Sequence, residues 1–414
     1  MKVLVIGTGG REHALARALS TDPAVTALYC APGNPGIGQV AELRAVDQLD
    51  PAAVRDLAVE LGVDLVIVGP EAPLVAGVAD PVREAGIPVF GPSRAAALLE
   101  GSKAFSKEVM AAAGIPTAAS YVCETEEEYS KALDEFAGFP YVVKDDALAA
   151  GKGVVVTEDR DAALAHAREC GRVVIEEYLD GPEVSLFGVT DGTTVVPMMP
   201  SQDFKRIGDG DTGLNTGGMG SYCPLPWAPE GLTDEVVTTV IQPLVDEMRR
   251  RGTPFVGLVY AGLALTAKGM RVVEFNARFG DPETQSVLAM LESPLSELLY
   301  PAATGTLADA PAPRWRDGAA VTVVLAAAGY PGTPRGGDVI NGVADAENLG
   351  TAVNQAGTKR NADGELVTAG GRVLAVTAVA QDLHAARAKA YSGVAAIGFD
   401  GAQHRTDIAA EAAA

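Results

Sequence analysis

Three polar side chains alternate along one stretch of the chain: Glu274, Asn276 and Arg278. They follow an apolar run, so they have the position expected at the polar end of a strand. Residues two apart in a strand share a face, so Val273 and Phe275 are expected to point the other way, toward a core. Carboxylate and amide oxygens suit Mg²⁺, and the arginine fork suits a phosphate or carboxylate. The alternative is a strand end with ordinary solvated charges.

A second stretch, KDDALAAGKGV, carries the lysines Lys144 and Lys152 near its two ends. Backbone amides and ammonium groups on a flexible, glycine-containing hairpin can together neutralise the charge of phosphates. The stretch lacks the G-x-x-x-x-G-K-[ST] pattern, which excludes a Walker A loop. A mobile surface hairpin is the alternative for this stretch read alone.

The apolar strand predicted at 173–179 runs into the acidic residues Glu176 and Glu177, and a Gly-Pro turn then leads to Glu183. Such a strand-to-hinge segment can offer backbone groups to a purine base, with Glu183 accepting from ribose hydroxyls. Acidic residues at a strand end are more often simply solvated, and that alternative stays open here.

The segment Ser201–Tyr222 is rich in glycine and shows no hydrophobic period. Long irregular loops within compact domains are usually functional or disordered. This one carries Asp203, Lys205 and Arg206, which are candidates for binding a substrate.

The first hundred residues alternate short apolar runs with helical stretches, which predicts a parallel sheet with crossover helices. Loops at the carboxyl ends of such strands line ligand sites. The first loop, GTGGREH, fails the dinucleotide fingerprint because the third glycine would fall at Glu12, which argues against NAD or FAD. A helix that begins after Gly9 and Gly10 can still bind an anion. The predicted strands are Val3–Ile6, Ala27–Cys30, Leu65–Val68 and Val89–Phe90, the helices are Arg11–Ser20, Pro51–Leu61 and Ala79–Ala85, and the loops are Gly7–His13, Ala31–Gly36 and Gly69–Pro73.

The rest of the chain is predicted to mix helices and strands, with Ser102 as the N-cap of a helix over 104–113. In residues 313–414, apolar strands alternate with Gly/Pro turns, which predicts a small β-rich unit. The predicted helices are Glu126–Phe136, Asp234–Arg250 and Leu383–Ala395, and the predicted strands are Tyr121–Cys123, Tyr141–Lys144, Gly257–Thr266 and Met270–Phe275, with the alternating C-terminal pattern at Ala319–Ala327, Gly329–Pro334, Val339–Gly342 and Arg372–Ala378.

Composition bounds the class of protein. A chain of 414 residues is long enough for about three domains, and the hydrophobic share of 48% indicates a globular protein. The net charge of -22 argues against a nucleic-acid or anionic-membrane surface, although local lysines and arginines can still bind a small anion. Four scattered cysteines without C-x-x-C spacing, and the lack of a signal-like or membrane-spanning run, predict a cytoplasmic location.

The order of these motifs resembles the ATP-grasp superfamily: a helix start bearing Lys103, a Lys…Gly-Lys-Gly flap, an E-E-x-L hinge and an E-x-N strand. More specific stretches, among them GTGGREHALA, APGNPG, VGPEAPLVAG, GPSRAAALLEGSKAF, LAAGKGV, SQDFKR, TGGMGSY, EFNARFGDPETQ, AGTK and GGRVLAVTA, resemble the phosphoribosylamine–glycine ligase family from residue 3 to about residue 380.

The resemblance implies α/β and α+β architecture: a Rossmann-like parallel-sheet domain (1–101), an ATP-grasp domain (102–312) with a mobile flap subdomain (about 118–186), and a small β-rich domain (313–414). It also implies a reaction. ATP phosphorylates the carboxylate of glycine, and 5-phosphoribosylamine attacks the acyl phosphate to give glycinamide ribonucleotide, ADP and phosphate in de novo purine synthesis. Such chemistry needs positioning, charge neutralisation and exclusion of water. The chain is expected to be a monomer or a weak homodimer.

Carried over residue by residue, the family pattern assigns roles in this chain. Mg²⁺ or Mn²⁺ would be bound by Glu274 and Asn276, with Arg278 and Asp281 beside the reacting carboxylate and Lys152 also catalytic. The ATP site would comprise Lys103, Lys144, Lys152, Glu176, Glu177, Leu179 and Glu183. The substrate sites would comprise Gly10, Arg11, Asn34, Glu71, Asp203, Lys205, Arg206, Lys359 and Arg372, the last two from the C-terminal domain, where ordinary surface charge is the alternative.

The sequence departs from the family pattern in the flap, where Asp145 replaces Ala and Ala147 replaces Gly. A carboxylate near phosphates should repel them, and Ala147 cannot take positive φ cheaply. Phe204 stands where the family often has His, Leu214 where it often has Pro, and the segment 161–172 is short. Two other functions remain open: a different ATP-grasp carboxylate–amine ligase, and a nucleotide-binding protein without catalysis.

Overall fold

The computed structural model describes residues 1–147 and 153–414, and its first unit is an all-parallel sheet with strand order β3-β2-β1-β4-β5. In β1, Val3 and Val5 pack with α1, while Leu4 and Ile6 pack with α2 and α4, so both faces are covered and the strand is apolar throughout. The strands are β1 (Lys2–Gly7), β2 (Ala27–Pro32), β3 (Glu42–Leu43), β4 (Leu65–Val68) and β5 (Val89–Phe90), and the helices are α1 (Gly10–Ser20), η1 (Ile37–Gln39), α2 (Pro51–Leu61), α3 (Glu71–Ala76), α4 (Ala79–Glu84) and α5 (Arg94–Gly101).

Two loops of this unit are shorter than the sequence predicts. Helix α1 begins at Gly10, so the first loop ends at Gly9, and α3 begins at Glu71 inside the predicted loop Gly69–Pro73. Pro73 lies in the first turn of α3, where a missing N–H costs nothing, so the proline was no sign of a loop. Glu12 accepts from Gly9 N–H and fills the space beside Gly7 and Gly69, so a pyrophosphate at this helix end would have to displace a carboxylate.

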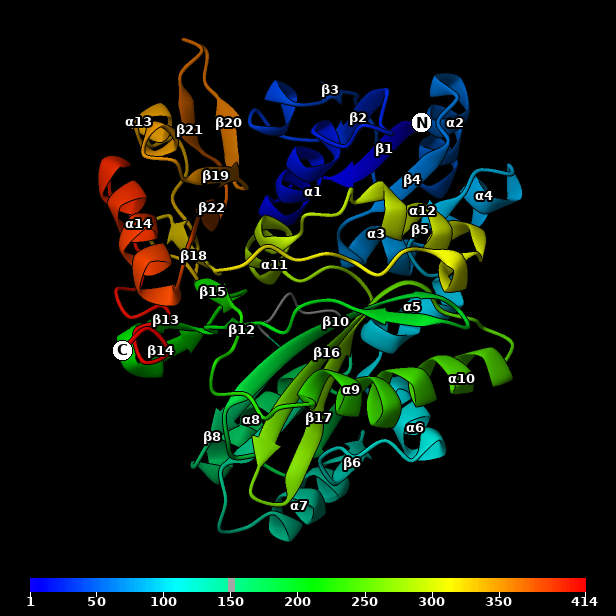
Figure 1. Ribbon diagram of the computed structural model, residues 1–414. Helices are drawn as coiled ribbons and strands as arrows, with labels where there is room; N and C mark the ends of the chain where they lie inside the picture. Colours follow the sequence, from blue (N-terminus) through cyan, green and yellow to red (C-terminus); the bar gives the residue numbers. More distant parts are fainter. Residues whose placement is uncertain (148–152) are drawn as a thin grey trace.

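The central unit contains two antiparallel sheets, with strand orders β11-β10-β16-β17 and β6-β9-β7-β8. Figure 1 shows the first of these below the N-terminal unit, with the run from α9 to α10 along it. The strands are β6 (Ser120–Cys123), β7 (Tyr141–Asp145), β8 (Val154–Thr157), β9 (Val173–Glu176), β10 (Glu183–Asp191), β11 (Val195–Pro197), β16 (Val256–Thr266) and β17 (Gly269–Asn276). The helices are α6 (Lys103–Ala113), α7 (Glu126–Glu135), α8 (Arg160–Cys170), α9 (Leu232–Val236), α10 (Gln242–Arg250), α11 (Glu283–Met290), α12 (Ser296–Thr304) and η4 (Leu307–Asp309).

Ser102 caps α6 as predicted, since its hydroxyl accepts from Phe105 N–H. The single helix predicted over 234–250 is interrupted by a π-helical turn, η3 (Val237–Ile241). Pro243 follows this turn and lacks the N–H that a regular ladder would need there, which accounts for the wider turn.

A third sheet, with order β12-β15-β18-β22-β19, joins the glycine-rich segment to the C-terminal unit. The prediction of an irregular loop over Ser201–Tyr222 is therefore wrong, because the segment contains four short strands. These strands are too short and too rich in glycine to show the alternation of apolar and polar residues that is typical of a strand. The segments 329–334 and 339–342 form no named strand and contribute only isolated bridges at Val339 and Asn341. The elements are β12 (Gln202–Asp203), β13 (Arg206–Gly208), η2 (Asp209–Asp211), β14 (Thr212–Asn215), β15 (Gly220–Cys223), β18 (Ala319–Ala326), α13 (Val343–Asn348), β19 (Ala352–Gln355), β20 (Thr358–Arg360), β21 (Leu366–Thr368), β22 (Arg372–Ala380) and α14 (Leu383–Ala396).

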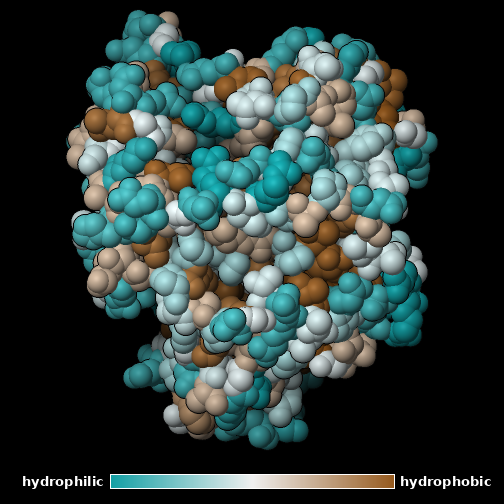
Figure 2. Space-filling model, in the orientation of Figure 1, coloured by the Kyte–Doolittle hydropathy of each residue, from teal (hydrophilic) through white to brown (hydrophobic). Residues whose placement is uncertain are grey.

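The face of the molecule seen in Figure 2 is largely hydrophilic or intermediate, with apolar residues in small groups. Within residues 1–147 and 153–414, no helix combines the length and the apolar character needed to cross a membrane.

Candidate functional site

Strand β17 carries the proposed metal-binding pair, and a β-bulge shapes it. Gly262 pairs with Glu274, but Leu263 pairs with Val272, so Val273 is an extra residue in β17. As a result Val272 is fully buried in the core and Val273 is only half-buried, which corrects the predicted alternation. The bulge lies before Glu274, so Glu274 and Asn276 still share a face of the strand.

The charges of three lysines from separate segments act on the carboxylate of Glu274. Burial alone would raise the pKa of Glu274. The positive charges of Lys205, Lys144 and Lys103 outweigh burial, with Arg278 adding a smaller effect, and they hold its pKa below the ordinary value. Lys103 begins α6, Lys144 lies in β7 and Lys205 follows β12. The charges of Lys103 and Lys144 thus both act on Glu274, whereas Lys152 lies outside the described residues.

Glu176 lies between two lysines instead of facing open space. Its Oε1 pairs with Lys144 Nζ, and its Oε2 lies 2.7 Å from Lys107 Nζ. Lys144 Nζ also donates to the carbonyl of Val273, at 3.1 Å, which ties β7 to the bulge of β17. Burial works against the charge of Lys144, but Glu176 and Glu274 raise its pKa above the ordinary value. The carboxylate of Glu176 thus positions Lys144.

Lys107 belongs to this cluster and was missed by the sequence reasoning. It lies one helical turn after Lys103 on α6, and this i, i+4 spacing is the signal that would have found it. Its ammonium also donates to Thr117 Oγ1 at 2.9 Å, and burial lowers its pKa despite the charge of Glu176.

The hinge that follows β9 keeps its backbone outside the sheets. Residues 177–180 belong to no helix or strand, and in the described part of the chain the N–H and C=O of Leu179 have no backbone partner. Glu177 lies near two cations, with Lys268 at 3.3 Å and Arg271 at 3.5 Å. Free backbone groups at such a hinge match what a purine edge requires.

Side chains of the glycine-rich segment divide into two groups. Lys205 pairs with Glu183 and lies 3.9 Å from Asp203. Burial, with the charges of Glu283, Glu183 and Glu274, raises the pKa of Asp203 to about 7 although Lys205 opposes it. Arg206 instead donates to Gly213 O in the β13–β14 hairpin, so it is not brought to the cluster around Glu274.

Arg278 connects β17 to the N-terminal unit. Its Nε lies 3.2 Å from Glu71 Oε2, and its Nη2 lies 2.9 Å from Glu100 Oε1. Burial alone would raise the pKa of Glu71, but Arg278 and Arg11 lower it to about 2. Burial raises the pKa of Glu100 although Arg278 opposes it. Sequence reasoning missed Glu100, which lies in an otherwise ordinary amphipathic helix.

Asp281 is the meeting point of the N-terminal and C-terminal units. Its Oδ2 accepts from the backbone N–H of Arg11 at 3.3 Å, and its Oδ1 accepts from Gln285 at 2.8 Å. Arg372 Nη1 lies 3.5 Å from Asp281 Oδ1 and also donates to Gly217 O at 2.6 Å. Burial would raise the pKa of Asp281, but Arg372 and Arg11 keep it below the ordinary value.

The remaining predicted substrate-binding residues differ in how far they are already engaged by other parts of the protein. Gly10 lies at this junction, where a Cβ would come within 2.9 Å of Gln285 Nε2. Asn34 is buried and fully bonded: its Nδ2 donates to Thr8 O and Gln355 O, and its Oδ1 accepts from two backbone N–H groups. Its side chain therefore shapes the loop. Lys359 is exposed on the β20–β21 hairpin.

The departures from the family pattern have local explanations in two cases. Asp145 Oδ1 accepts from Ala147 N–H at 3.1 Å. In the described part of the chain the non-glycine residues with positive φ are Asp211 and Ala409, so the strain expected at Ala147 is absent. Phe204 lies under the guanidinium of Arg405, 4.8 Å from its ring centre. Nothing in the structure explains Leu214.

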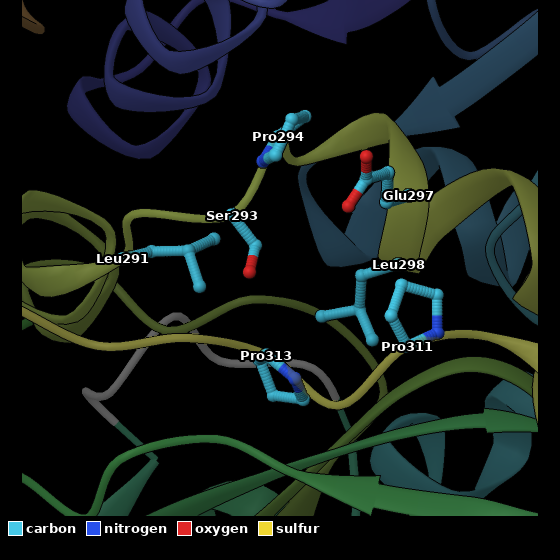
Figure 3. Close-up of a pocket in the computed structure, with 7 residues that line it drawn as sticks. All are labelled: Leu291, Ser293, Pro294, Glu297, Leu298, Pro311 and Pro313. Atoms are coloured by element: carbon cyan, nitrogen blue, oxygen red, sulfur yellow. The ribbon is translucent and has the colours of Figure 1, made fainter.

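A small cavity elsewhere is unrelated to this site. Figure 3 shows it between the start of α12 and the segment 311–313. Its volume is ≈ 10 Å³, and none of its lining residues belongs to the predicted site. Its lining residues are Leu291, Ser293, Pro294, Glu297, Leu298, Pro311 and Pro313.

Comparison with known proteins gives the family. The models of the N domain, the ATP-grasp (A) domain and the C domain of phosphoribosylglycinamide synthetase match residues 1–100, 101–284 and 320–411. The phosphoribosylamine–glycine ligase of Streptomyces coelicolor is 67% identical, with 100% of each chain covered. That of Mycobacterium tuberculosis (H37Rv) is 58% identical over 100% of this chain and 99% of the relative.

Solved structures agree with these matches. The phosphoribosylamine–glycine ligase of Thermotoga maritima superposes with a TM-score of 0.85 at 30% identity, covering 99% of this chain and 100% of that one. N5-carboxyaminoimidazole ribonucleotide synthetase from Thermus thermophilus shares the fold, with a TM-score of 0.65 at 20% identity over 95% and 96% of the two chains. The chain belongs to the phosphoribosylglycinamide synthetase family.

Proposed function

We propose that this chain joins glycine to 5-phosphoribosylamine at the expense of ATP, giving glycinamide ribonucleotide, ADP and phosphate in de novo purine synthesis. The observation that supports it most is that the positive charges of Lys103, Lys144 and Lys205 together hold the pKa of the buried Glu274 below its ordinary value. A buried carboxylate surrounded by cations suits a polyphosphate together with a divalent cation. Membership of the family, over nearly the whole chain, supplies the substrates.

ATP would lie between the flap subdomain and the sheet that contains β17. Lys103 and Lys144 would contact its phosphates, with Lys152 joining them from the flap. The backbone of Leu179 would bind the adenine edge, flanked by Glu176 and Glu177. Glu183 would accept a hydrogen bond from a ribose hydroxyl after its ion pair with Lys205 breaks. Because Glu176 is buried at 3% exposure between two lysines, its contribution would come through Lys144.

The donor set around Glu274 fits Mg²⁺ or Mn²⁺. Glu274 has a lowered pKa, and Asn276 Oδ1 receives only one long hydrogen bond, 3.4 Å from Arg278, among the described residues. Within the described residues, no group of three or more His, Cys, Asp or Glu side chains could hold a metal. Two protein oxygens suit an ion that takes its other ligands from water and phosphates. When bound, the ion would neutralise phosphate charge.

Phosphoribosylamine would bind where the N-terminal and C-terminal units meet. Gly10 and Arg11 adjoin Asp281 at this junction, and Glu71 lies 3.7 Å from Arg11 Nη2. Asn34 would act by holding its loop. Arg372 would need to release the carbonyl of Gly217 to reach a phosphate, and Lys359 would need to move with its hairpin. Both remain phosphate-binding candidates on this proposal.

The reaction then proceeds by two transfers. A carboxylate oxygen of glycine attacks the γ-phosphorus of ATP, the bond to the bridging oxygen breaks, and ADP leaves. The amine nitrogen of phosphoribosylamine attacks the carbonyl of glycyl phosphate, phosphate leaves, and the nitrogen loses a proton. Arg278 would neutralise the reacting carboxylate, and Asp281, whose lowered pKa keeps it ionised, would hold Arg11 and Arg372 beside it.

Cellular context follows from the same proposal. All four cysteines are free thiols, which agrees with a reducing cytoplasm. The acidic balance disfavours nucleic acid as a partner, and we retain a monomer or weak homodimer, acting on small molecules away from membranes.

ADP release tests this function directly. Full-length protein is assayed with ATP, Mg²⁺, glycine and freshly generated phosphoribosylamine, omitting each component in turn. ADP release that needs both glycine and phosphoribosylamine supports the proposal. Release with another carboxylate or amine would indicate a different ATP-grasp ligase, and ATP binding without glycine-dependent phosphate release would indicate a protein without catalysis.

A further inference from the structure

Glu283, at the start of α11, is a buried carboxylate with one oxygen unused. Its side chain is 3% exposed, and its Oε1 accepts from Tyr260 Oη at 2.6 Å. Its Oε2 is buried and has no hydrogen-bond partner among the described residues. Burying an ionised oxygen without a partner is costly, so such an atom indicates a missing donor.

The position of Glu283 is fixed by a short chain of hydrogen bonds. The single hydroxyl proton of Tyr260 is donated to Glu283. The hydroxyl of Ser185, 2.8 Å from the Tyr260 hydroxyl, must therefore be the donor in the bond between them. Gly280 lies on the side of the unused oxygen, where a Cβ would stand 2.6 Å from Glu283 Oε2. A side chain at residue 280 would therefore occupy the space beside that oxygen.

A second buried carboxylate faces the same region. Asp203, on β12, feels the negative charges of Glu283, Glu183 and Glu274, and Lys205 is the cation that opposes them. Asp203 pairs with Ser221 in the β12–β15 ladder, and the hydroxyl of Ser221 donates to the carbonyl of Pro282, the neighbour of Glu283. Tyr260, which donates to Glu283, lies opposite Asn276 in the β16–β17 ladder, so both carboxylates lie near the proposed reacting centre. A small cation placed there would relieve the repulsion of these carboxylates.

We propose that Glu283 Oε2 and Asp203 bind the α-ammonium group of glycine, with Tyr260 and Ser185 as positioning residues. This rests on the proposed function, in which the glycine carboxylate reacts near Glu274. In glycine the ammonium lies one methylene from the carboxylate, so its counter-charges must adjoin the reacting centre, as Asp203 does. A primary ammonium has three donors and can satisfy both carboxylates at once.

Glu283→Gln tests this assignment because it keeps the shape of the side chain and removes its charge. Loss of a hydrogen bond to a charged group predicts a rise in KM for glycine of about 10- to 100-fold. KM for ATP should change by less than about twofold. Inhibition by propionate, which replaces the ammonium with a methyl group, should not weaken, since propionate makes no use of Glu283. Glu247→Gln, which alters a paired carboxylate on α10, is the matched control and should leave all three values unchanged.

Gly280→Ala provides a second variant that removes no charge. Its methyl group would crowd Glu283 Oε2, so KM for glycine should rise while inhibition by propionate falls less. An unchanged KM for glycine in a folded Glu283→Gln protein would overturn the assignment, and so would equal losses for glycine and propionate. If Glu283→Gln does not fold, the same comparison in Gly280→Ala decides. Wild-type protein without glycine-dependent ADP release would instead refute the proposed function.

Discussion

Arg278, two residues after β17, and Glu71 of α3 form an ion pair across the junction of two units, with Nε and Oε2 3.2 Å apart. The pair lies between the sheet that carries Glu274 and the loops of the N-terminal parallel sheet. It therefore links the proposed ATP site to the proposed phosphoribosylamine site.

Glu71 should make stability depend on pH. Its folded-state pKa is about 2 against an ordinary 4.5, so the stabilisation is fully present above pH 4.5 and is lost as the pH falls toward 2. The shift corresponds to roughly 3 kcal/mol at most. Urea unfolding of wild type and Glu71→Gln should show a difference in free energy of unfolding that is constant from pH 7 to 5 and shrinks at lower pH. A difference that grows on acidification would contradict the pairing; Glu42→Gln, at an exposed ion pair, is the control.

Glu176→Gln should weaken ATP binding. The amide cannot hold both Lys144 and Lys107 by charge, so Lys144 loses its fixed position and the two lysines repel each other. We expect KM for ATP to rise about tenfold or more, since hydrogen bonds between charged groups are strong. KM for glycine should change little.

The control for this variant is Glu126→Gln in the same subdomain. Glu126 pairs with Arg168 at the surface, with both side chains 55% exposed, and such pairs contribute little. Equal ATP kinetics in Glu176→Gln and Glu126→Gln would show that Lys144 does not need Glu176.

Asp145→Ala combined with Ala147→Gly should lower KM for ATP. The carboxylate of Asp145 accepts from Ala147 N–H, and in the proposed flap its negative charge would oppose incoming phosphates. Because Ala147 has an ordinary φ, Asp145→Asn alone should give most of the gain, about two- to fivefold for one removed like charge. Unchanged or poorer ATP kinetics in the double variant would reject the idea, and Ala147→Gly alone serves as the comparison.

Regular elements with strong local signals were predictable from sequence. Helix α2 begins and ends as predicted because Asp50 caps it and Gly62 ends it in the left-handed region. Strand β4 is apolar at every position, as a strand covered on both faces must be. Both elements are specified by residues within or next to their own segments.

Features that depend on distant partners were not predictable. The bulge at Val273 needs Gly262 and Leu263 of β16. Strand β15 pairs with the distant β18, and β12 joins that sheet only through β15. Glu100 and Lys107 reach the site through Arg278 and Glu176, which lie far away in sequence. The resemblance to a family could place Glu274 and Lys144, but only three-dimensional pairing reveals that Asn34 and Glu176 are already engaged.

The central claim is that Glu274 and Asn276, with the lysines around them, hold the metal and phosphates of ATP. ADP release dependent on glycine and phosphoribosylamine, measured at saturating Mg²⁺ for wild type and Glu274→Gln, tests it most directly. The account predicts a loss of turnover of at least about 100-fold in the variant. The reason is that Glu274→Gln removes a negative charge that would hold the Mg²⁺ next to the phosphoryl group being transferred. Turnover equal to that of wild type would contradict it.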